Sequence, residues 1–398
     1  MKTVGIVTEY NPFHLGHLHQ INETRAAFEN DAAIVCVMSG NFVQRGDAAI
    51  FNKHARACAA VESGADLVLE LPAPWALGSA ERFAEGAVSI LDSLGLVSHI
   101  SFGSESGDTA LLEELALALI SPALGEEMKP FLAEGLPFAE ARQRALEEKL
   151  GEKAAELRKP NNLLAAEYIK ALYNRRSAIK PHAIKRVGAG HDEHGGGEIM
   201  SASEIRLKWA SSEDMRNAVP KAAFDIYENE MRQGRGPVRL ENLECAILSR
   251  LRMMPQEYFE TLPDASEGLG NRLFAAVRSQ ASLDGVIAEA KTKRYAMSRI
   301  RRLVMCAALG IGGDVSAEEP PYIRVLAANE KGRAVLKEAA ERASKPIITK
   351  PAAVKKLDSF AQKVFEIENG AANLYCLAYG ALEERRPSGE WRATPYMK

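Results

Sequence analysis

The first hundred residues alternate between short apolar runs and longer stretches with helical spacing. Each apolar run is continuous, which is typical of strands buried on both faces of a parallel sheet. The predicted strands are Thr3–Thr8, Ala32–Met38, Ala65–Leu71 and Val97–Phe102, and the predicted helices are Gly16–Glu29, Asn52–Ser63 and Ser79–Leu94. Because crossovers between parallel strands are right-handed, this order predicts an α/β fold with a Rossmann-like, doubly wound parallel sheet.

Beyond residue 108 the pattern changes. Residues 109–178 are rich in Ala, Leu, Glu and Lys with helical spacing and predict a helical insertion, after which His182–Val187 returns as a fifth strand. From Ser201 onward nearly every stretch has helical spacing, broken by Pro and Gly. A typical domain has about 150 residues, so a chain of this length is expected to form two. We predict one domain at residues 1–215, with the sheet and the insertion, and a second, mostly α-helical domain at residues 216–398.

The overall composition excludes some classes of protein. The 398 residues carry a net charge of −3, so a nucleic-acid partner has to bind a local basic patch. The five cysteines are widely spaced without a Cys-x-x-Cys, which argues against a disulfide scaffold or a zinc ribbon. The N-terminus does not resemble a signal peptide, and no apolar run reaches the about 18 residues of a membrane span. We therefore expect a cytoplasmic protein.

The loop after the first predicted strand places two histidines at a helix start. Residues 9–17 read EYNPFHLGH. The carboxyl edge of a strand that meets a helix N-terminus is where open α/β sheets bind phosphates. There His14 and His17 can face one anion and donate hydrogen bonds to a phosphoryl transition state, while Gly16 lets a nucleotide approach closely. The alternative is a pair of surface histidines at a helix cap.

Residues 11–17 resemble the His-x-Gly-His signature of the nucleotidylyltransferases, whose reaction at the ATP α-phosphate releases pyrophosphate. Ser201, Ser203 and Arg206 resemble the Ser-x-Thr-x-x-Arg element of the same superfamily, with Ser203 where Thr is commoner. The resemblance implies that these side chains bind the β- and γ-phosphates from a helix N-terminus. Ser201 and Glu204 also have the spacing of a capping box, which is compatible with phosphate binding.

Further segments narrow the resemblance to the bacterial tRNA(Met) cytidine acetate ligases. They are VMSGNFVQRGD at 37–47, GADLVLELP at 64–72, FGSE at 102–105, PNN at 160–162 and IKRVG at 184–188, with Tyr295 and Arg299 in the C-terminal part. The resemblance covers essentially the whole chain. It implies that acetate attacks ATP to give acetyl-adenylate and pyrophosphate, and that the wobble cytidine of elongator tRNA(Met) then takes the acetyl group on N4, releasing AMP.

The resemblance also implies the residues that contact ATP. They are Val7, Thr8, Glu9, Tyr10, Asn11, Pro12, Phe13, His14, Leu15, Gly16, His17, Leu18, His19, Gln20, Gly103, Asn162 and Arg186. Alternatives stay open for three of them: Gly103 as a strand-end turn, Asn162 as a helix cap and Arg186 as a surface charge. We expect magnesium to accompany ATP, held mainly by phosphates and water, and we expect no metal site at His191–His194.

Two groups are candidates for the other substrates. The loop after the second strand holds Asn41, Gln44 and Arg45, which are expected to form an acetate or cytidine pocket with Lys53. In this pocket Arg45 can hold a carboxylate or a tRNA phosphate. The alternative is a solvated loop.

A basic segment lies at residues 291–302, KTKRYAMSRIRR, which hold six basic residues and no acid. We predict that it forms a basic helix that binds RNA. The alternative is a solvated helix face. The candidate tRNA-binding residues are Lys291, Lys293, Arg294, Tyr295, Arg299, Arg301 and Arg302.

Two other functions stay open from the sequence. One is a small-molecule adenylyltransferase of the same superfamily, and the other is a non-catalytic, ATP-gated RNA-binding module. The intact His14, His17 and Ser201–Arg206 elements favour chemistry over binding alone. The sequence does not indicate which group acts as a general base in the acetyl transfer.

Overall fold

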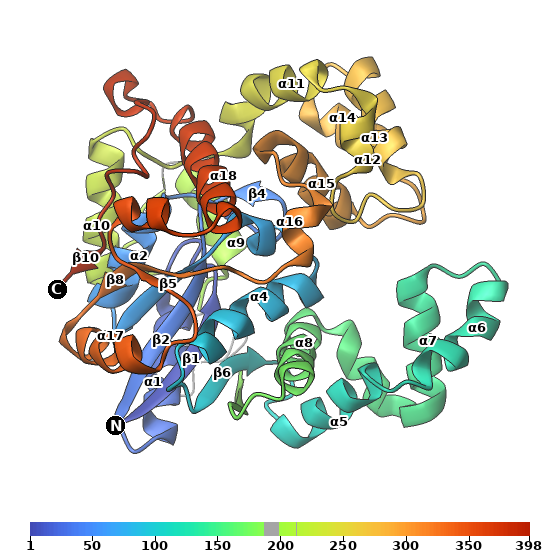
Figure 1. The fold of residues 1–398 in the computed structure, drawn as a ribbon, viewed down its shortest axis with the longest axis horizontal. Coiled ribbons are helices and arrows are strands. Elements are labelled where there is room, and N and C mark those ends of the chain that lie inside the picture. The colour runs from blue at the N-terminus through green and yellow to red at the C-terminus, as the bar shows by residue number, and fades with distance from the viewer. Residues whose placement is uncertain (187–198, 212) are drawn as a thin grey trace.

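One large sheet lies at the centre of the computed structural model, which describes residues 1–186, 199–211 and 213–398 (Figure 1). The strands from the first half of the chain are β1 (Lys2–Thr8), β2 (Ala32–Ser39), β5 (Leu67–Leu71), β6 (His99–Ser104) and β7 (Lys180–Lys185). They are parallel to one another, in the order β5-β2-β1-β6-β7. The order reverses between β1 and β6, so the predicted doubly wound topology is confirmed.

Helices cover both faces of the sheet, because successive side chains of a strand point to opposite faces. Val35 and Val37 of β2 lie in one apolar core, and Ile34 and Cys36 lie in the other. The first core is covered by α3 (Ala73–Ala76), α4 (Ala80–Ser93), α8 (Pro160–Arg175) and α17 (Glu330–Arg342), and the second by α1 (Leu15–Ala27), α2 (Lys53–Glu62) and α10 (Lys221–Arg232). The elements predicted in the first hundred residues agree with these bounds to within about two residues.

The predicted helical insertion lies between β6 and β7. It holds α5 (Thr109–Leu119), α6 (Leu124–Ala133), α7 (Phe138–Leu150) and a 3-10 helix, Gly151–Arg158, before α8. In Figure 1 the segment from α5 to α7 projects away from the sheet, whereas α8 runs beside α4. The last helix of the insertion therefore returns to the body of the fold, where its start lies near the carboxyl end of β6.

The second half of the chain is mostly helical, as predicted. Besides α10 and α17, its helices are α9 (Ala202–Ala210), α11 (Glu244–Met253), α12 (Gln256–Glu260), α13 (Leu269–Ser279), α14 (Leu283–Ala290), α15 (Met297–Leu309), α16 (Gly313–Ala317) and α18 (Ser359–Cys376), with 3-10 helices at Leu240–Leu243, Pro351–Lys356 and Leu382–Glu384. In Figure 1, α11 to α15 gather in a cluster of their own. Within the described residues, no helix combines the length and the apolar character needed to cross a membrane.

The second half also extends the sheet, which the sequence analysis missed. The strand β8 (Ile323–Ala328) pairs antiparallel with β5, and β9 (Ile347–Ile348) and β10 (Tyr396–Met397) pair with β8. Every residue of β8 is buried, including Arg324, which interrupts the apolar pattern by which a strand is recognised. We predicted a mostly helical chain after Ser201 and named no strand there, so this strand was missed.

A small antiparallel hairpin follows β2 at the carboxyl edge of the sheet. It consists of β3 (Phe42–Val43) and β4 (Asp47–Ala48). At its turn Gly46 has a φ of +72°, and a Cβ at this position would lie 2.5 Å from the carbonyl carbon of Arg301 on α15. Because only glycine permits both this backbone conformation and this close approach, the hairpin packs directly against α15.

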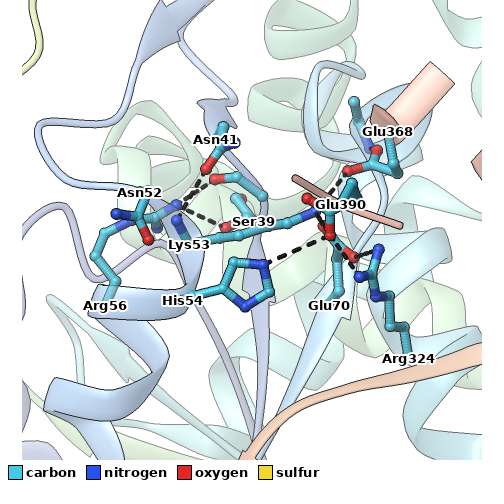
Figure 2. A network of polar contacts seen from close by, with 12 residues as sticks. Ser39, Asn41, Asn52, Lys53, His54, Arg56, Glu70, Arg324, Glu368 and Glu390 are labelled. Carbon is cyan, nitrogen blue, oxygen red and sulfur yellow. Dashed lines mark hydrogen bonds and ion pairs between the residues drawn. The ribbon is translucent and has the colours of Figure 1, made fainter. Parts of the chain in front are cut away.

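A buried cluster of charged side chains joins the C-terminal segment to the sheet (Figure 2). The Nζ of Lys53 lies 3.0 Å from Glu390 Oε1 and 3.4 Å from Glu368 Oε2, and it also pairs with Glu70 on β5. Arg324 pairs with Glu70 and Glu390. Burial and the neighbouring Glu70 raise the pKa of Glu368 to about 8, so this carboxyl is protonated at neutral pH. Two cations then balance two carboxylates, which is the condition under which buried charges are tolerated.

Lys53→Met should destabilise the fold, because it removes the central cation and leaves Glu70 and Glu390 with Arg324 alone. Removing one partner of a buried ion pair costs about 3–5 kcal/mol, so the urea midpoint of unfolding should fall. Lys331→Met, at an exposed position of α17, is the matched control and should change the free energy of unfolding by less than about 0.5 kcal/mol. Equal midpoints for the two variants would contradict this role of the cluster.

Candidate active site

Two histidine rings lie against each other at the start of α1, shortly after β1, with their planes tilted by 34°. His14 caps the helix, and its Nδ1 accepts a hydrogen bond from the Gly16 N–H at 3.0 Å. His17 Nδ1 accepts from the His14 N–H at 3.2 Å, and the ring centroids lie 3.8 Å apart. Since both Nδ1 atoms accept, each neutral ring carries its proton on Nε2. The pair can therefore present two N–H donors to an anion.

The surroundings keep both rings neutral. Burial lowers the pKa of His14 to about 4, and the charges of Arg186 and Arg206 act in the same direction. Burial, His14 and Arg186 lower the pKa of His17 well below its usual value. The positive charge that acts on His14 therefore comes from Arg186 and Arg206, while the histidines contribute oriented hydrogen-bond donors.

Glycine is required between the two histidines. A Cβ at Gly16 would lie 2.8 Å from His14 Cε1, too close for the ring to keep its capping position. Two aromatic rings pack next to the histidine pair. The Tyr10 ring centroid lies 4.8 Å from that of His17 and 4.7 Å from that of Phe13. Both aromatic side chains are buried, so they set the shape of the loop by packing.

The start of α9 lies near the same loop. Ser201 caps this helix by accepting a hydrogen bond from the Glu204 N–H at 3.2 Å, as its spacing predicted. Arg206 donates from Nη1 to the Asn11 carbonyl at 2.7 Å and from Nη2 to Ser203 Oγ at 3.1 Å. The guanidinium thus ties α9 to the histidine-bearing loop, and the N-termini of α1 and α9 both bring backbone N–H groups to this region.

Two adjoining cavities open at the carboxyl edge of the sheet. The first cavity, of about 220 Å³, is lined by His14, Gly16, His17, His19, Gln20, Gly103, Ile184, Lys185, Arg186, Ile199, Met200, Ser201 and Ala202. The second cavity, of about 470 Å³, is lined by Val7, Thr8, Glu9, His17, Gln20, Gln44, Arg45, Ala80, Phe83, Phe102, Gly103, Pro160, Asn161, Leu163, Leu164, Tyr168, Arg186, Ser298 and Arg302. His17, Gln20, Gly103 and Arg186 line both, so the two cavities share a wall at the reversal point of the sheet.

The second cavity has one apolar wall and one basic wall. Phe83, Phe102 and Tyr168 form the apolar side, and the start of α8 brings Leu163 and Leu164 to it. This wall was not predicted, because it combines residues from the sheet, α4 and the far end of the insertion. The only sequence signal was the position of Phe102 beside Gly103 at the end of a predicted strand.

Arg302 on α15 belongs to the basic wall. Its Nε is buried and has no hydrogen-bond partner among the described residues, and burial lowers the pKa of its guanidinium. Buried polar groups are normally hydrogen-bonded, so a donor without a partner at a cavity wall is available to a polar ligand. Ser298, one turn before Arg302, lines the same cavity. The C-terminal half of the chain thus contributes directly to the site.

A fully buried guanidinium fixes the strand ends that surround the cavities (Figure 2). Arg56 on α2 donates to the carbonyls of Ser39 at 3.1 Å and Phe51 at 2.9 Å, and also to those of Gly40 and Glu9. It therefore holds together the ends of β1 and β2. No role for Arg56 was predicted, because nothing in the sequence pattern shows that an arginine of this helix points inward.

Most residues expected to contact ATP lie at these cavities. Those that line one or both are Val7, Thr8, Glu9, His14, Gly16, His17, His19, Gln20, Gly103 and Arg186. Four residues of the loop are buried and line neither cavity: Tyr10, Asn11, Pro12 and Phe13. The two cavities are also not lined by Leu15 or Leu18. The His191–His194 segment lies outside the described residues.

The structure shows which groups Asn162 contacts within the chain, while its expected contact with ATP stays a prediction. Its side chain is completely buried. Its Oδ1 accepts from the N–H groups of Glu105 at 2.8 Å and Ser106 at 3.2 Å, and its Nδ2 donates to Glu156 at 2.6 Å. The amide therefore holds the loop after β6 against α8, and Asn162 is not among the residues that line the two cavities. Nor does it cap the helix, since the N-cap of α8 is Lys159.

The pocket assigned to Asn41, Gln44, Arg45 and Lys53 is corrected in part. Gln44 and Arg45 line the second cavity. Lys53, only 1% exposed, is enclosed by carboxylates of the buried cluster, and Asn41 Oδ1 accepts from the Lys53 N–H at 2.8 Å. Both side chains face inward because they anchor the start of α2.

The predicted basic helix over 291–302 is also corrected. The helix α15 begins only at Met297, so residues 291–296 form a non-helical connection and the basic side chains do not share one helical face. Tyr295 is buried, and its hydroxyl donates to the Glu267 carbonyl at 2.6 Å, so its ring is not free to stack on a base. Arg299 donates to the Asp264 carbonyl and to Ser266 Oγ. Lys293 and Arg294 are exposed.

Comparison with known proteins identifies the family. The model of the family described as HIGH Nucleotidyl Transferase matches residues 1–389. The chain belongs to this family. It is 40% identical to the tRNA(Met) cytidine acetate ligase of Fervidobacterium nodosum, over 88% of this chain and 84% of the relative, and 39% identical to that of Caldanaerobacter subterraneus subsp. tengcongensis, over 95% and 96%.

A solved structure of the family has the same fold. The structure of Thermotoga maritima TmcAL bound with alpha-thio ATP superposes on this chain with a TM-score of 0.93 and 34% sequence identity, covering 100% of this chain and 99% of that one. Apo Thermotoga maritima TmcAL matches equally well. The α/β nucleotidyltransferase fold with a mostly helical C-terminal region is thereby confirmed.

His14→Asn should separate ligand binding from folding. Asparagine is a preferred N-cap residue and keeps an oxygen for the Gly16 N–H, but it removes the Nε2 donor. If that donor binds a phosphate oxygen, its loss should weaken ATP binding about 10- to 100-fold, the effect of about 1.5–3 kcal/mol for a hydrogen bond to a charged group. Isothermal titration calorimetry measures the affinity, and thermal unfolding should be nearly unchanged.

His182→Asn on β7 is the matched control, since His182 lines neither cavity. It should leave ATP affinity unchanged. Wild-type affinity in His14→Asn would contradict the role assigned to the histidine pair.

Proposed function

We propose that this protein is an ATP-dependent ligase that acetylates N4 of the wobble cytidine in elongator tRNA(Met) through an acetyl-adenylate. The observation that carries the proposal is the wall shared by the two cavities. Acetyl-adenylate formed next to His17 and Arg186 can be reached from both cavities. The acetyl group that is activated by ATP in the first cavity can therefore be attacked by the cytidine from the second cavity. The names of the relatives support the choice of acetate and tRNA(Met).

In the first step, ATP occupies the first cavity with its phosphates over the N-termini of α1 and α9. The carboxylate oxygen of acetate attacks the α-phosphorus, and the bond to the pyrophosphate oxygen breaks. His14 and His17 donate from Nε2 to the phosphate oxygens as charge builds on them, and Arg186 and Arg206 supply positive charge. Ser201 and Ser203 at the start of α9 are placed to bind the outer phosphates.

Arg45 and Gln44 are proposed to hold the acetate on the side of the second cavity. A guanidinium pairs well with a carboxylate, and Arg45 on the hairpin faces this cavity. Because Arg45 projects from a loop that packs against α15, its position depends on both halves of the chain.

Magnesium is proposed to enter with ATP. Among the described residues that line the first cavity there is no carboxylate, and Mg²⁺ prefers oxygen ligands. The ion would therefore be held by the phosphates and by water, and the steps assigned to the protein do not depend on it.

The helical second half is proposed to bind the tRNA. We assign residues 1–215 to ATP and acetate and residues 216–398 to tRNA, with Arg302 and Ser298 reaching from α15 into the shared site. Exposed Lys293 and Arg294, just before α15, and Arg301, within it, are candidates for phosphate contacts. The apolar wall of the second cavity suits an unstacked base. Since tRNA is the proposed substrate, we place the reaction in the cytoplasm.

The proposal is tested by incubating the protein with ATP, radiolabelled acetate and unfractionated tRNA, followed by digestion of the RNA to nucleosides. Label should appear in N4-acetylcytidine, and pyrophosphate should be released only when acetate is present. Acetate-dependent pyrophosphate without labelled RNA would indicate a small-molecule adenylyltransferase. Neither signal, with ATP still bound, would indicate an ATP-gated RNA-binding module.

A further inference from the structure

We infer that Glu9 is the general base of the second step, accepting the N4 proton as the cytidine attacks acetyl-adenylate. This inference rests on the proposed function and names the group that carries out its proton transfer. Glu9 follows β1 directly, at the carboxyl edge of the sheet, and its side chain lines the second cavity. It is therefore on the side from which the cytidine approaches the shared wall.

One carboxylate oxygen of Glu9 is hydrogen-bonded within the protein, whereas the other has no hydrogen-bond partner among the described residues. Its Oε1 accepts a hydrogen bond from the Gln44 N–H at 2.8 Å, which links it to the hairpin. Its main-chain carbonyl accepts from Arg56. Among the described residues, no hydrogen bond to Oε2 is found, so this oxygen remains available to a ligand in the cavity. A fixed backbone and one free oxygen are what a positioned base requires.

The other titratable groups around the second cavity cannot accept a proton at neutral pH. His17 uses Nδ1 to accept from the main chain and carries its proton on Nε2, so it has no free lone pair. Burial raises the pKa of Tyr168 well above its usual value, which keeps the phenol protonated. The remaining ones, Arg45, Arg186 and Arg302, are guanidinium cations. Among the described lining residues, Glu9 is the single carboxylate.

The environment of Glu9 also suits a base. Burial raises its pKa above the usual value, against the opposing effects of the Gln44 N–H and of Arg56, Arg206 and Arg45. A carboxylate that is more basic than usual transfers a proton more effectively near neutral pH. The charged and titratable groups that face it are Arg56 on α2, Arg206 on α9, Arg45 on the hairpin and Tyr168 on α8.

The exocyclic amine of cytosine needs such a group, since its lone pair is delocalised into the ring. As N4 attacks the carbonyl carbon of acetyl-adenylate, the N–C bond forms and one N4 proton passes to the Glu9 carboxylate. The C–O bond to the phosphate then breaks, and AMP leaves with the electron pair. Glu9 returns its proton to solvent, so charge and atoms balance without a further reactant.

Glu9→Gln tests the inference by separating the two steps. Glutamine keeps an oxygen for the Gln44 N–H but cannot accept the proton. Acetate-dependent ATP–pyrophosphate exchange, measured without tRNA, should fall much less than acetyl transfer, because Glu9 is an expected ATP contact but accepts no proton in the first step. Single-turnover acetyl transfer to tRNA should fall about 10²- to 10⁴-fold. Glu23→Gln, at an exposed position of α1, is the matched control and should leave both rates unchanged.

The pH dependence gives a second readout. In the wild type, transfer should rise with pH through the raised pKa of Glu9, because the base is active only when ionised, and Glu9→Gln should lack this limb. Unchanged transfer in Glu9→Gln, or exchange and transfer that fall in parallel, would overturn the inference and leave the proposed function standing. A wild-type protein without acetate-dependent exchange would overturn both.

Discussion

The geometry of the site depends on one buried guanidinium, that of Arg56. Parallel strands end at a common edge, but their carbonyl groups there have no partners in the sheet. Arg56 donates to the carbonyls of Glu9, Ser39 and Gly40 and so closes the ends of β1 and β2 against α2. The histidine loop and Glu9 follow β1, and the hairpin follows β2. Because Arg56 holds these two strand ends together, it also fixes the positions of the segments that follow them.

The second constraint is that the two halves of the chain build one site. The buried cluster around Lys53 fastens β8, α18 and Glu390 to β5 and α2, and Gly46 brings the hairpin against α15. As a result Ser298 and Arg302 line a cavity whose other residues come from the sheet and the insertion. An RNA held by the helical half would thereby meet an activated acid at the wall shared with the first cavity.

The sequence predicted the features that depend on local pattern. Continuous apolar runs predicted the parallel strands, and the loop ending at His17 predicted the start of α1, because both signals lie within a few residues. Features that depend on partners distant in the sequence were not predictable. Arginine and lysine usually lie on the surface, yet Arg324 and Lys53 are buried, each paired with buried carboxylates. Tyr295 is also buried, and its hydroxyl donates to the Glu267 carbonyl. The apolar wall of the second cavity likewise combines Phe102 with Tyr168 across the insertion.

The central claim is that acetate attacks the α-phosphorus of ATP over the histidine pair. Its most direct test is a turnover with acetate labelled with oxygen-18 at both carboxylate oxygens, followed by mass spectrometry of the products. The mechanism predicts one labelled oxygen in AMP and the other in the acetyl group of the RNA. Unlabelled AMP, or label in inorganic phosphate or pyrophosphate, would contradict activation at the α-phosphate and with it the role assigned to His14 and His17.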